Sequence, residues 1–387
     1  MTYHLKRDSY LVFGSPVIEN AEIQEVIDCM KSGWLGTGPK VAKFESDFAL
    51  YKGAKNTIAL NSCTAALHLS IITAGIQPGD EVITTPMTFC ASINSIIHSG
   101  ATPVLVDIDP KTLNIDPEKI ESKITSKTKA ILPVHFAGRP CDMVKLGNIS
   151  QCHNLKIIED CAHAIETEYQ GQKTGTFGDF GCFSFYVTKN IITGEGGMVI
   201  IKSEEDAARI KMLALHGMSK DAWNRFADDG YKHYYVLECG YKYNMMDLQA
   251  AIGLHQLYKI EKYWQRRQEI WGKYNQAFAN LPIGLPPVPE INTRHAYHLY
   301  TIQVDKLKSG ISRDDFLNAM NSHKIGVGVH YLSIPEHPYY QKTFGWKPED
   351  YPYAMKFGRQ TVSLPLSAKL TDEEVNDVIV TVQNILI

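Results

Sequence analysis

Short apolar runs and amphipathic runs alternate along the first two thirds of the chain. Short apolar runs are typical of buried strands, and apolar positions three or four apart are typical of helices. The expected strands are Glu81 to Thr85, Thr102 to Asp107, Ala130 to His135 and Leu155 to Glu159, and the expected helices are Ala21 to Met30, Thr64 to Ile72, a segment reaching about His98, and Met143 to Cys152. This alternation predicts an α/β fold with right-handed crossovers and a mostly parallel sheet, which binds ligands at the carboxyl ends of its strands.

The pattern changes near residue 255. A long charged helix is expected from Gln256 to Leu281, followed by a proline-bearing stretch over 282–289. Beyond it we expect strands around Tyr297 to Val304 and near Gly326 to His330, a helix from Ser312 to Ser322, and a last helix from Thr371 onward. We therefore predict a large domain over residues 1–255 and a smaller α+β domain over residues 256–387.

Composition and charge narrow the class of protein. The chain has 387 residues, of which 44% are apolar and 21% charged, as is ordinary for a globular enzyme with a large core. Its formal charge of −3 gives no electrostatic case for a nucleic acid or an anionic membrane as partner. Eight scattered cysteines without a C-x-x-C pair, no signal-peptide core and no apolar stretch of about 18 residues lead us to expect a cytoplasmic protein.

One lysine is the leading candidate for chemistry. Lys189 follows the apolar run Gly181 to Val187 and precedes the glycine-rich return Gly194 to Gly197. An arbitrary lysine is mostly exposed, but a lysine on a turn behind a buried strand can be held away from bulk water. Burial lowers the pKa of an amine, so that the amine can form a Schiff base with an aldehyde.

A carboxylate follows the expected strand Leu155 to Glu159. Asp160 comes directly after it, and His163 lies just beyond among small residues. Enzymes that use pyridoxal phosphate (PLP) need a carboxylate facing the pyridine nitrogen, because the protonated ring is what accepts carbanion electrons. Asp160 is the candidate for this role, and its spacing from Lys189 leaves room for another strand.

A third group of residues could bind a phosphate. Small hydroxyl residues open the helix expected from Thr64, where free N–H groups and the helix dipole favour an anion. A hydroxyl residue at a helix start is more often a plain cap, so this signal gains weight only beside the lysine and the aspartate. Ser184 could donate another hydroxyl from a strand end, and Phe89 could stack on a pyridine ring, although a core position is its other interpretation.

Together these segments resemble the DegT/StrS family of sugar-nucleotide aminotransferases over nearly the whole chain. The motifs that carry the resemblance are Asn61 to Leu69, Pro86 to Phe89, Glu159 to Ala164, Phe183 to Asn190, Gly194 to Gly197 and Gly240 to Asn244. Within the family the sequence is most similar to the ArnB-type branch, which aminates a 4-keto sugar attached to UDP. This second similarity rests on Gly217 to Ser219, Trp223 and Gly310 to Asp314.

The resemblance implies PLP-dependent transferase fold type I, as in aspartate aminotransferase, with a mostly parallel seven-stranded sheet and a homodimer that shares its active sites. It implies that PLP is linked to Lys189 and that Asp160 pairs with the ring nitrogen. The other implied cofactor contacts are Phe89 on the ring, Thr64 and Ser184 on the phosphate, Cys63 through its backbone, Asn244 toward the neighbouring subunit's phosphate, and His163 where many relatives carry glutamine near the phenolic oxygen.

The resemblance also implies a reaction. L-glutamate would give its amino group to a nucleotide-linked keto sugar, for surface polysaccharide or modified-sugar biosynthesis, with Lys189 as general base and acid. By the same resemblance His330 and Tyr331 lie near the sugar. His330 and His337, with Glu336, suit no known zinc signature, so we expect no metal.

Several alternatives stay open. Sugar dehydratases use the same scaffold and cofactor, but those relatives replace the lysine with histidine. Amino acid aminotransferases and sulfur amino acid lyases of fold type I would need an arginine for a substrate carboxylate, and the sequence does not sort Arg225, Arg294 and Arg313. A non-catalytic PLP-binding regulator is the alternative from another class, although the lysine, the acid and the phosphate residues that catalysis needs are all present.

Overall fold

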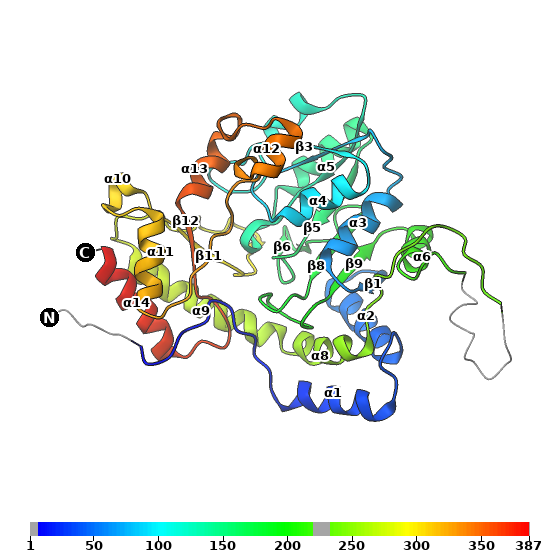
Figure 1. Cartoon of the computed structure of the whole chain (residues 1–387), viewed down its shortest axis with the longest axis horizontal. Coiled ribbons are helices and arrows are strands. Elements are labelled where there is room, and N and C mark those ends of the chain that lie inside the picture. Colours follow the sequence, from blue (N-terminus) through cyan, green and yellow to red (C-terminus); the bar gives the residue numbers. More distant parts are fainter. Residues whose placement is uncertain (1–6, 220–232, 387) are drawn as a thin grey trace.

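A seven-stranded sheet forms the centre of the computed structural model, which describes residues 7–219 and 233–386 (Figure 1). The strands are β1 (Asn56–Leu60), β2 (Glu81–Thr84), β3 (Thr102–Leu105), β4 (Thr128–Leu132), β5 (Lys156–Asp160), β8 (Phe180–Ser184) and β9 (Gly197–Ile201). Their order is β1-β9-β8-β5-β4-β2-β3. β9 runs opposite to the other six strands of this sheet, so the predicted α/β class and mostly parallel seven-stranded sheet are confirmed.

Helices cover both faces of this sheet (Figure 1). They are α2 (Pro39–Lys52), α3 (Cys63–Thr73), α4 (Cys90–His98), α5 (Met143–His153), α6 (Glu204–Leu213) and α8 (Asp247–Tyr258). The first helix, α1 (Asn20–Ser32), packs on α8 instead. Phe44 and Phe48 lie one turn apart on α2, and they meet Phe183 of β8 and Phe185 just after it, which point to the same face of the sheet. Cys182, the residue before Phe183, points to the other face, into the cluster formed with α3.

A second apolar core lies in the C-terminal third of the chain. It is built from α9 (Ile260–Phe278), β11 (Tyr300–Gln303), α11 (Arg313–Ser322), β12 (Thr361–Leu364) and α14 (Asp372–Leu386). The same third of the chain contains α10 (Lys306–Ser309), and also α12 (Pro338–Phe344) and α13 (Pro352–Gln360), which pack into separate apolar clusters that include Ile93 and Met87. Tyr274, Tyr300 and Phe316 are fully buried in the second core, and Leu11 of the N-terminal arm joins them. A small sheet of β6 (Glu168–Tyr169), β7 (Gln172–Lys173) and β10 (Thr293–Arg294) lies apart from it.

Two expected elements were wrong. The single helix from Gln256 to Leu281 is in fact the end of α8 followed by α9, with a break at Lys259. The break lets α8 pack against the large sheet while α9 turns its apolar face to the second core. The segment from Gly326 to His330 is not a strand, because its backbone pairs with a neighbour through only a single bridge, from Gly328 to Ser363, with another bridge from Ile325 to Leu11 just before the segment.

The described part of the chain has no helix whose length and apolar character would let it span a bilayer. Residue 255, the predicted boundary between the domains, lies inside α8. The division into 1–255 and 256–387 stays a prediction.

Candidate active site

A cavity of about 500 Å³ opens where the parallel strands of the large sheet end. It is lined by Lys189, Asp160, His163, Phe89, Cys63, Thr64, Ser184, His330 and Tyr331, all of which were candidate site residues. The sheet explains the convergence, because β1, β2, β5 and β8 point their carboxyl ends to one edge. Segments far apart in the sequence thereby meet in one place.

Lys189 lies on a short turn that leaves β8. Its backbone N–H donates to the carbonyl of Tyr186 at 2.8 Å, and Thr193 returns the chain by bonding to Phe185 at 2.9 Å. The side chain reaches the cavity and is half-buried there, and this burial lowers the pKa of its amine to about 8 against the opposing effects of Cys63 and Asp160. An amine with that pKa can be neutral near physiological pH.

Asp160 is 4% exposed and held by two donors. One oxygen accepts the Ser92 hydroxyl at 2.7 Å and the other accepts the Ala162 N–H at 3.1 Å. Burial raises the pKa of the carboxyl, and these donors and Lys189 act in the opposite direction. Ser92 bonds in turn to Thr88 at 2.7 Å. The roles of Ser92 and Thr88 were not predicted, although two hydroxyl residues four positions apart at a helix start could have indicated that they bond to each other.

The first turn of α3 forms one wall of the cavity. The Ser62 hydroxyl caps the helix by accepting the Ala65 N–H at 3.1 Å, which leaves the N–H groups of Cys63 and Thr64 available to an anion. Gly197 at the start of β9 lies against this turn, and a Cβ there would be 2.4 Å from the carbonyl carbon of Ser62. The close packing of β9 against this helix start therefore requires glycine at residue 197.

His163 is buried in the cavity wall, and its hydrogen bonds define its tautomer. Its Nδ1 accepts the N–H of Ala137 at 3.3 Å. Since a neutral imidazole has a single N–H, we assign the proton to Nε2, which lies 3.0 Å from the Tyr331 hydroxyl oxygen. Burial, with Lys189 nearby, lowers the pKa of His163 well below its ordinary value, so the ring is neutral.

The aromatic rings of Phe89, His330 and Tyr331 line the cavity. Phe89 is 58% exposed, and its ring centroid is 5.9 Å from that of Tyr331. A large apolar ring exposed on a cavity can stack on a planar ligand. His330 bonds to the Ser363 hydroxyl at 2.8 Å and stacks on Phe13. Burial lowers the pKa of His330 to about 4.

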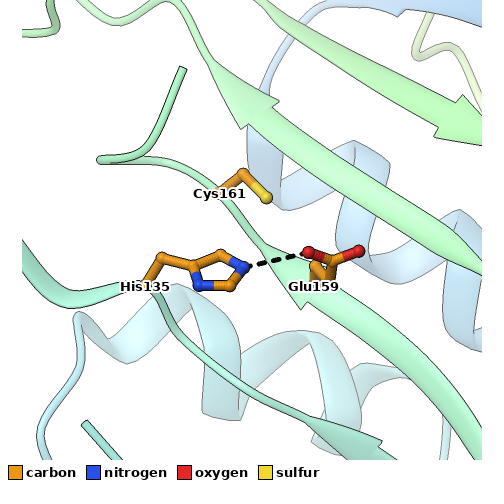
Figure 2. Close-up of side chains that lie close together, drawn as sticks. All are labelled: His135, Glu159 and Cys161. Carbon is orange, nitrogen blue, oxygen red and sulfur yellow. Dashed lines mark hydrogen bonds and ion pairs between the residues drawn. The ribbon is translucent and has the colours of Figure 1, made fainter. Parts of the chain in front are cut away.

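Another cluster, formed by His135, Glu159 and Cys161, has ligand atoms within 4.8 Å of one another (Figure 2). Glu159 accepts the backbone N–H groups of Gly175, Phe177 and Gly178 at 2.7 to 2.9 Å and the Nε2–H of His135 at 3.0 Å. His135 uses its other nitrogen to accept the N–H of Cys141 at 3.0 Å. With these lone pairs occupied, the cluster fastens the end of β5 to the following loop rather than offering ligands to a metal.

Asn244 lies outside this cavity. It lines another hollow with Trp34 and Thr37, donates to the Thr37 hydroxyl at 2.7 Å, and has a buried Oδ1 without a hydrogen-bond partner among the described residues. An unpaired buried carbonyl oxygen costs stability, so a partner from outside the chain would stabilise it. The predicted contact with a neighbouring subunit stays a prediction.

The candidate arginines can now be placed. Arg294 pairs with Glu261 at 2.5 Å and lies over the ring of Trp264. Arg313 pairs with Asp314 and donates to a backbone carbonyl. Neither lines the cavity, and Arg225 and Trp223 lie outside the described residues.

The residues on the cavity fit PLP. They supply an amine with a lowered pKa, a buried carboxylate held by donors, an exposed ring for stacking, and a helix start with free N–H groups. A phosphate, a pyridinium ring and an aldehyde each need one of these groups. Cys63 would contribute its backbone N–H, because it is the first residue of α3 and the Ser62 side chain caps the helix through Ala65 instead. Burial raises the pKa of the Cys63 thiol well above the ordinary value.

Comparisons with known proteins agree with this interpretation. The profile of the DegT/DnrJ/EryC1/StrS aminotransferase family matches residues 16–383. The spore coat polysaccharide biosynthesis protein SpsC of Bacillus subtilis is 50% identical over 382 residues, which are 98% of each chain.

Solved structures extend the similarity to the fold. The PLP form of Spr1654 of Streptococcus pneumoniae, assigned as a sugar aminotransferase, is 35% identical with a TM-score of 0.89, covering 97% of this chain and 99% of that one. Helicobacter pylori PseC, an aminotransferase involved in pseudoaminic acid biosynthesis, is 28% identical with a TM-score of 0.90, covering 98% and 99%.

Proposed function

The chain belongs to the DegT/DnrJ/EryC1/StrS aminotransferase family, and we propose that it transfers an amino group from L-glutamate to a nucleotide-linked keto sugar. Its cofactor is PLP. The observation that carries the proposal is the meeting of Lys189, Asp160 and the first turn of α3 on one cavity. The ArnB-type preference for a 4-keto sugar on UDP remains the finer prediction within this class.

PLP supplies an aldehyde that takes up the amino group and a ring that accepts electrons. Lys189 would hold the cofactor and would move a proton at its Nζ in each half of the reaction. Asp160, held by Ser92, would keep the ring nitrogen protonated. Phe89 would position the ring, and Thr64, Ser184 and the Cys63 N–H would bind the phosphate. His330 and Tyr331 would contact the sugar, and His163 would lie beside the phenolic oxygen.

The relatives favour a sugar over an amino acid as acceptor, because Spr1654 is named as a sugar aminotransferase. Neither Arg294 nor Arg313 lines the cavity, but the donor L-glutamate also carries an α-carboxylate, so the positions of these arginines do not decide between the acceptors. The relation to SpsC, named for spore coat polysaccharide, supports a role in surface polysaccharide biosynthesis, and a cytoplasmic location would fit such a pathway.

We also propose a homodimer that completes each site. Apolar side chains are exposed along α1 and the loop after it, among them Met30, Trp34 and Leu35. This surface borders the hollow in which Asn244 has an unpaired oxygen. Burial of exposed apolar surface is the usual driving force for a symmetric dimer.

The test is a product assay. The protein with PLP and L-glutamate is incubated with a panel of nucleotide-linked keto sugars that vary in carrier and keto position, and 2-oxoglutarate and the aminated sugar are measured by mass. Wild type should convert at least one sugar, whereas Lys189→Ala should convert none while keeping its circular dichroism spectrum. A dehydrated sugar without added nitrogen would favour the dehydratase, and no reaction with glutamate would favour the regulator.

A further inference from the structure

His298 was not among the predicted site residues, yet it contacts two residues of the site region, Asn190 and His163. It lies just before β11 and is 6% exposed. Its ring centroid is 4.4 Å from that of His163. Its Nδ1 is 2.8 Å from the side-chain oxygen of Asn190, the residue after Lys189.

The bonds of Asn190 fix the tautomer of His298. The Asn190 amide donates one hydrogen to Glu166 at 2.8 Å and the other to the Ala296 carbonyl at 3.1 Å. Both partners are acceptors, so the amide nitrogen must face them and the amide oxygen must face His298. His298 therefore carries its proton on Nδ1 and donates it to Asn190. This bond from His298 to Asn190 thereby holds the turn that bears Lys189.

The other end of this network is a buried ion pair. Glu166 pairs with Arg267 of α9, and both side chains are buried. Arg267 also donates to the Ala296 carbonyl. The network thus joins the turn after Lys189 to a helix of the second core.

The backbone beside His298 sets the tautomer of His163. Ala296 N–H donates to the Gly138 carbonyl at 2.9 Å, and His298 N–H donates to the Ala137 carbonyl at 3.2 Å. Gly138 has φ of +98°, and a Cβ there would be 2.9 Å from that of Ala296, so this close approach requires glycine. The docked segment holds the Ala137 N–H that bonds to Nδ1 of His163.

We propose that His298 is a positioning residue of the aminotransferase site. The Nδ1–H of His298 holds Asn190 and, with it, the turn that bears Lys189. The ring of His298 packs on the ring of His163, so that the Nε2–H of His163 points at the hydroxyl oxygen of Tyr331. Because Tyr331 accepts this bond, its own hydroxyl hydrogen is left to be donated to an oxygen of the bound sugar. The inference rests on the proposed function and adds a specific donor to it.

The test compares matched variants in the two half-reactions, followed by cofactor absorbance. His298→Asn places an amide N–H where Nδ1–H stands, whereas His298→Gln places it where Nε2 stands. We expect His298→Gln to slow both half-reactions by about 10- to 100-fold, because Lys189 acts in each, and His298→Asn to recover most of the rate. Tyr331→Phe should slow the sugar half-reaction by about tenfold or more and leave the glutamate half-reaction within about threefold of wild type.

A readout independent of turnover is the tautomer itself. In the full-length protein labelled with ¹⁵N-histidine, long-range ¹⁵N–¹H spectra should show His298 protonated on Nδ1 and His163 on Nε2, with signals assigned from His298→Asn and His163→Gln. His295→Asn is the control, since His295 is buried in the same segment but contacts neither Asn190 nor His163; its half-reactions should stay within about threefold of wild type.

Three results would overturn the inference: equal rates for His298→Asn and His298→Gln, equal slowing of both half-reactions in Tyr331→Phe, or the reverse tautomers. If a variant unfolds in a thermal melt, the tautomers in the wild-type spectra still test the inference. A wild type that aminates no keto sugar would instead refute the proposed function, and the tautomers would then test the hydrogen-bond network independently of the reaction.

Discussion

Lys189 shows how a single residue acquires its chemistry from its surroundings. A free lysine has a pKa near 10.4, and the burial of this side chain lowers the pKa to about 8. The bond from its backbone N–H to Tyr186 fixes the turn that carries Lys189 beside the cavity. The pKa and the position together distinguish Lys189 from a solvent-exposed lysine.

The lowered pKa of Lys189 makes cofactor attachment depend on pH. Only the neutral amine is a nucleophile, so the rate constant for covalent incorporation of PLP into the apoprotein should rise with pH and level off above about 9. At pH 7 it should be about tenfold below the plateau. Stopped-flow absorbance measures it. A rate that still rises beyond pH 9.5 would mean an ordinary lysine.

Asp160 can be tested by removing its charge alone. Asp160→Asn should slow the half-reaction with glutamate by about 10²- to 10³-fold, because an amide does not keep the ring nitrogen protonated. The affinity for PLP should change by less than about tenfold. Asp179→Asn is the control, since Asp179 bonds to Ile157 at the other end of β5; a similar loss there would indicate a general effect on the strand.

At the scale of elements, the sequence was most informative where the pattern was local. Short apolar runs correctly predicted β2 to β5, and amphipathic spacing predicted α1, α3 and α5. The break at Lys259 escaped notice because α8 and α9 have a continuous helical pattern and differ only in the core that each one faces. Ser92 and His298 were missed because their roles depend on contacts with residues 68 and 108 positions away.

The contact between β9 and α3 gives a prediction at this scale. A methyl group at residue 197 would collide with the Ser62 backbone, so Gly197→Ala should push the helix start away and weaken PLP binding by about tenfold or more. Gly147→Ala in α5 is the control, because open space surrounds Gly147; it should raise the free energy of unfolding by about 0.5 to 1 kcal/mol. Equilibrium dialysis and denaturant melts measure both. Unchanged PLP affinity in Gly197→Ala would contradict the assignment of the phosphate site.

For the whole molecule, the question is whether one chain makes a complete site. Lys189 and Asn244 line separate hollows, and the apolar surface near Trp34 is 55% exposed at that residue. In the proposed dimer, Asn244 of one subunit would serve the cavity of the other.

Complementation tests this arrangement. Lys189→Ala and Asn244→Ala should each lose most activity, but an equal mixture that is unfolded and refolded together should recover about a quarter of the wild-type rate, because half of the dimers are mixed and each has one intact site. The variants refolded separately and then combined are the control. A mixture no better than Asn244→Ala alone would place Asn244 in its own subunit's site.

Glu159 and Asp160 stand side by side on β5, and the pleat sends them to opposite faces. One carboxylate fastens a loop, and the other faces the cavity. Deletion of one residue within this strand would exchange the directions of the two side chains. Glu159 could then no longer hold the loop, and Asp160 could no longer face the cavity. Insertions and deletions here should therefore be tolerated far less than substitutions during evolution.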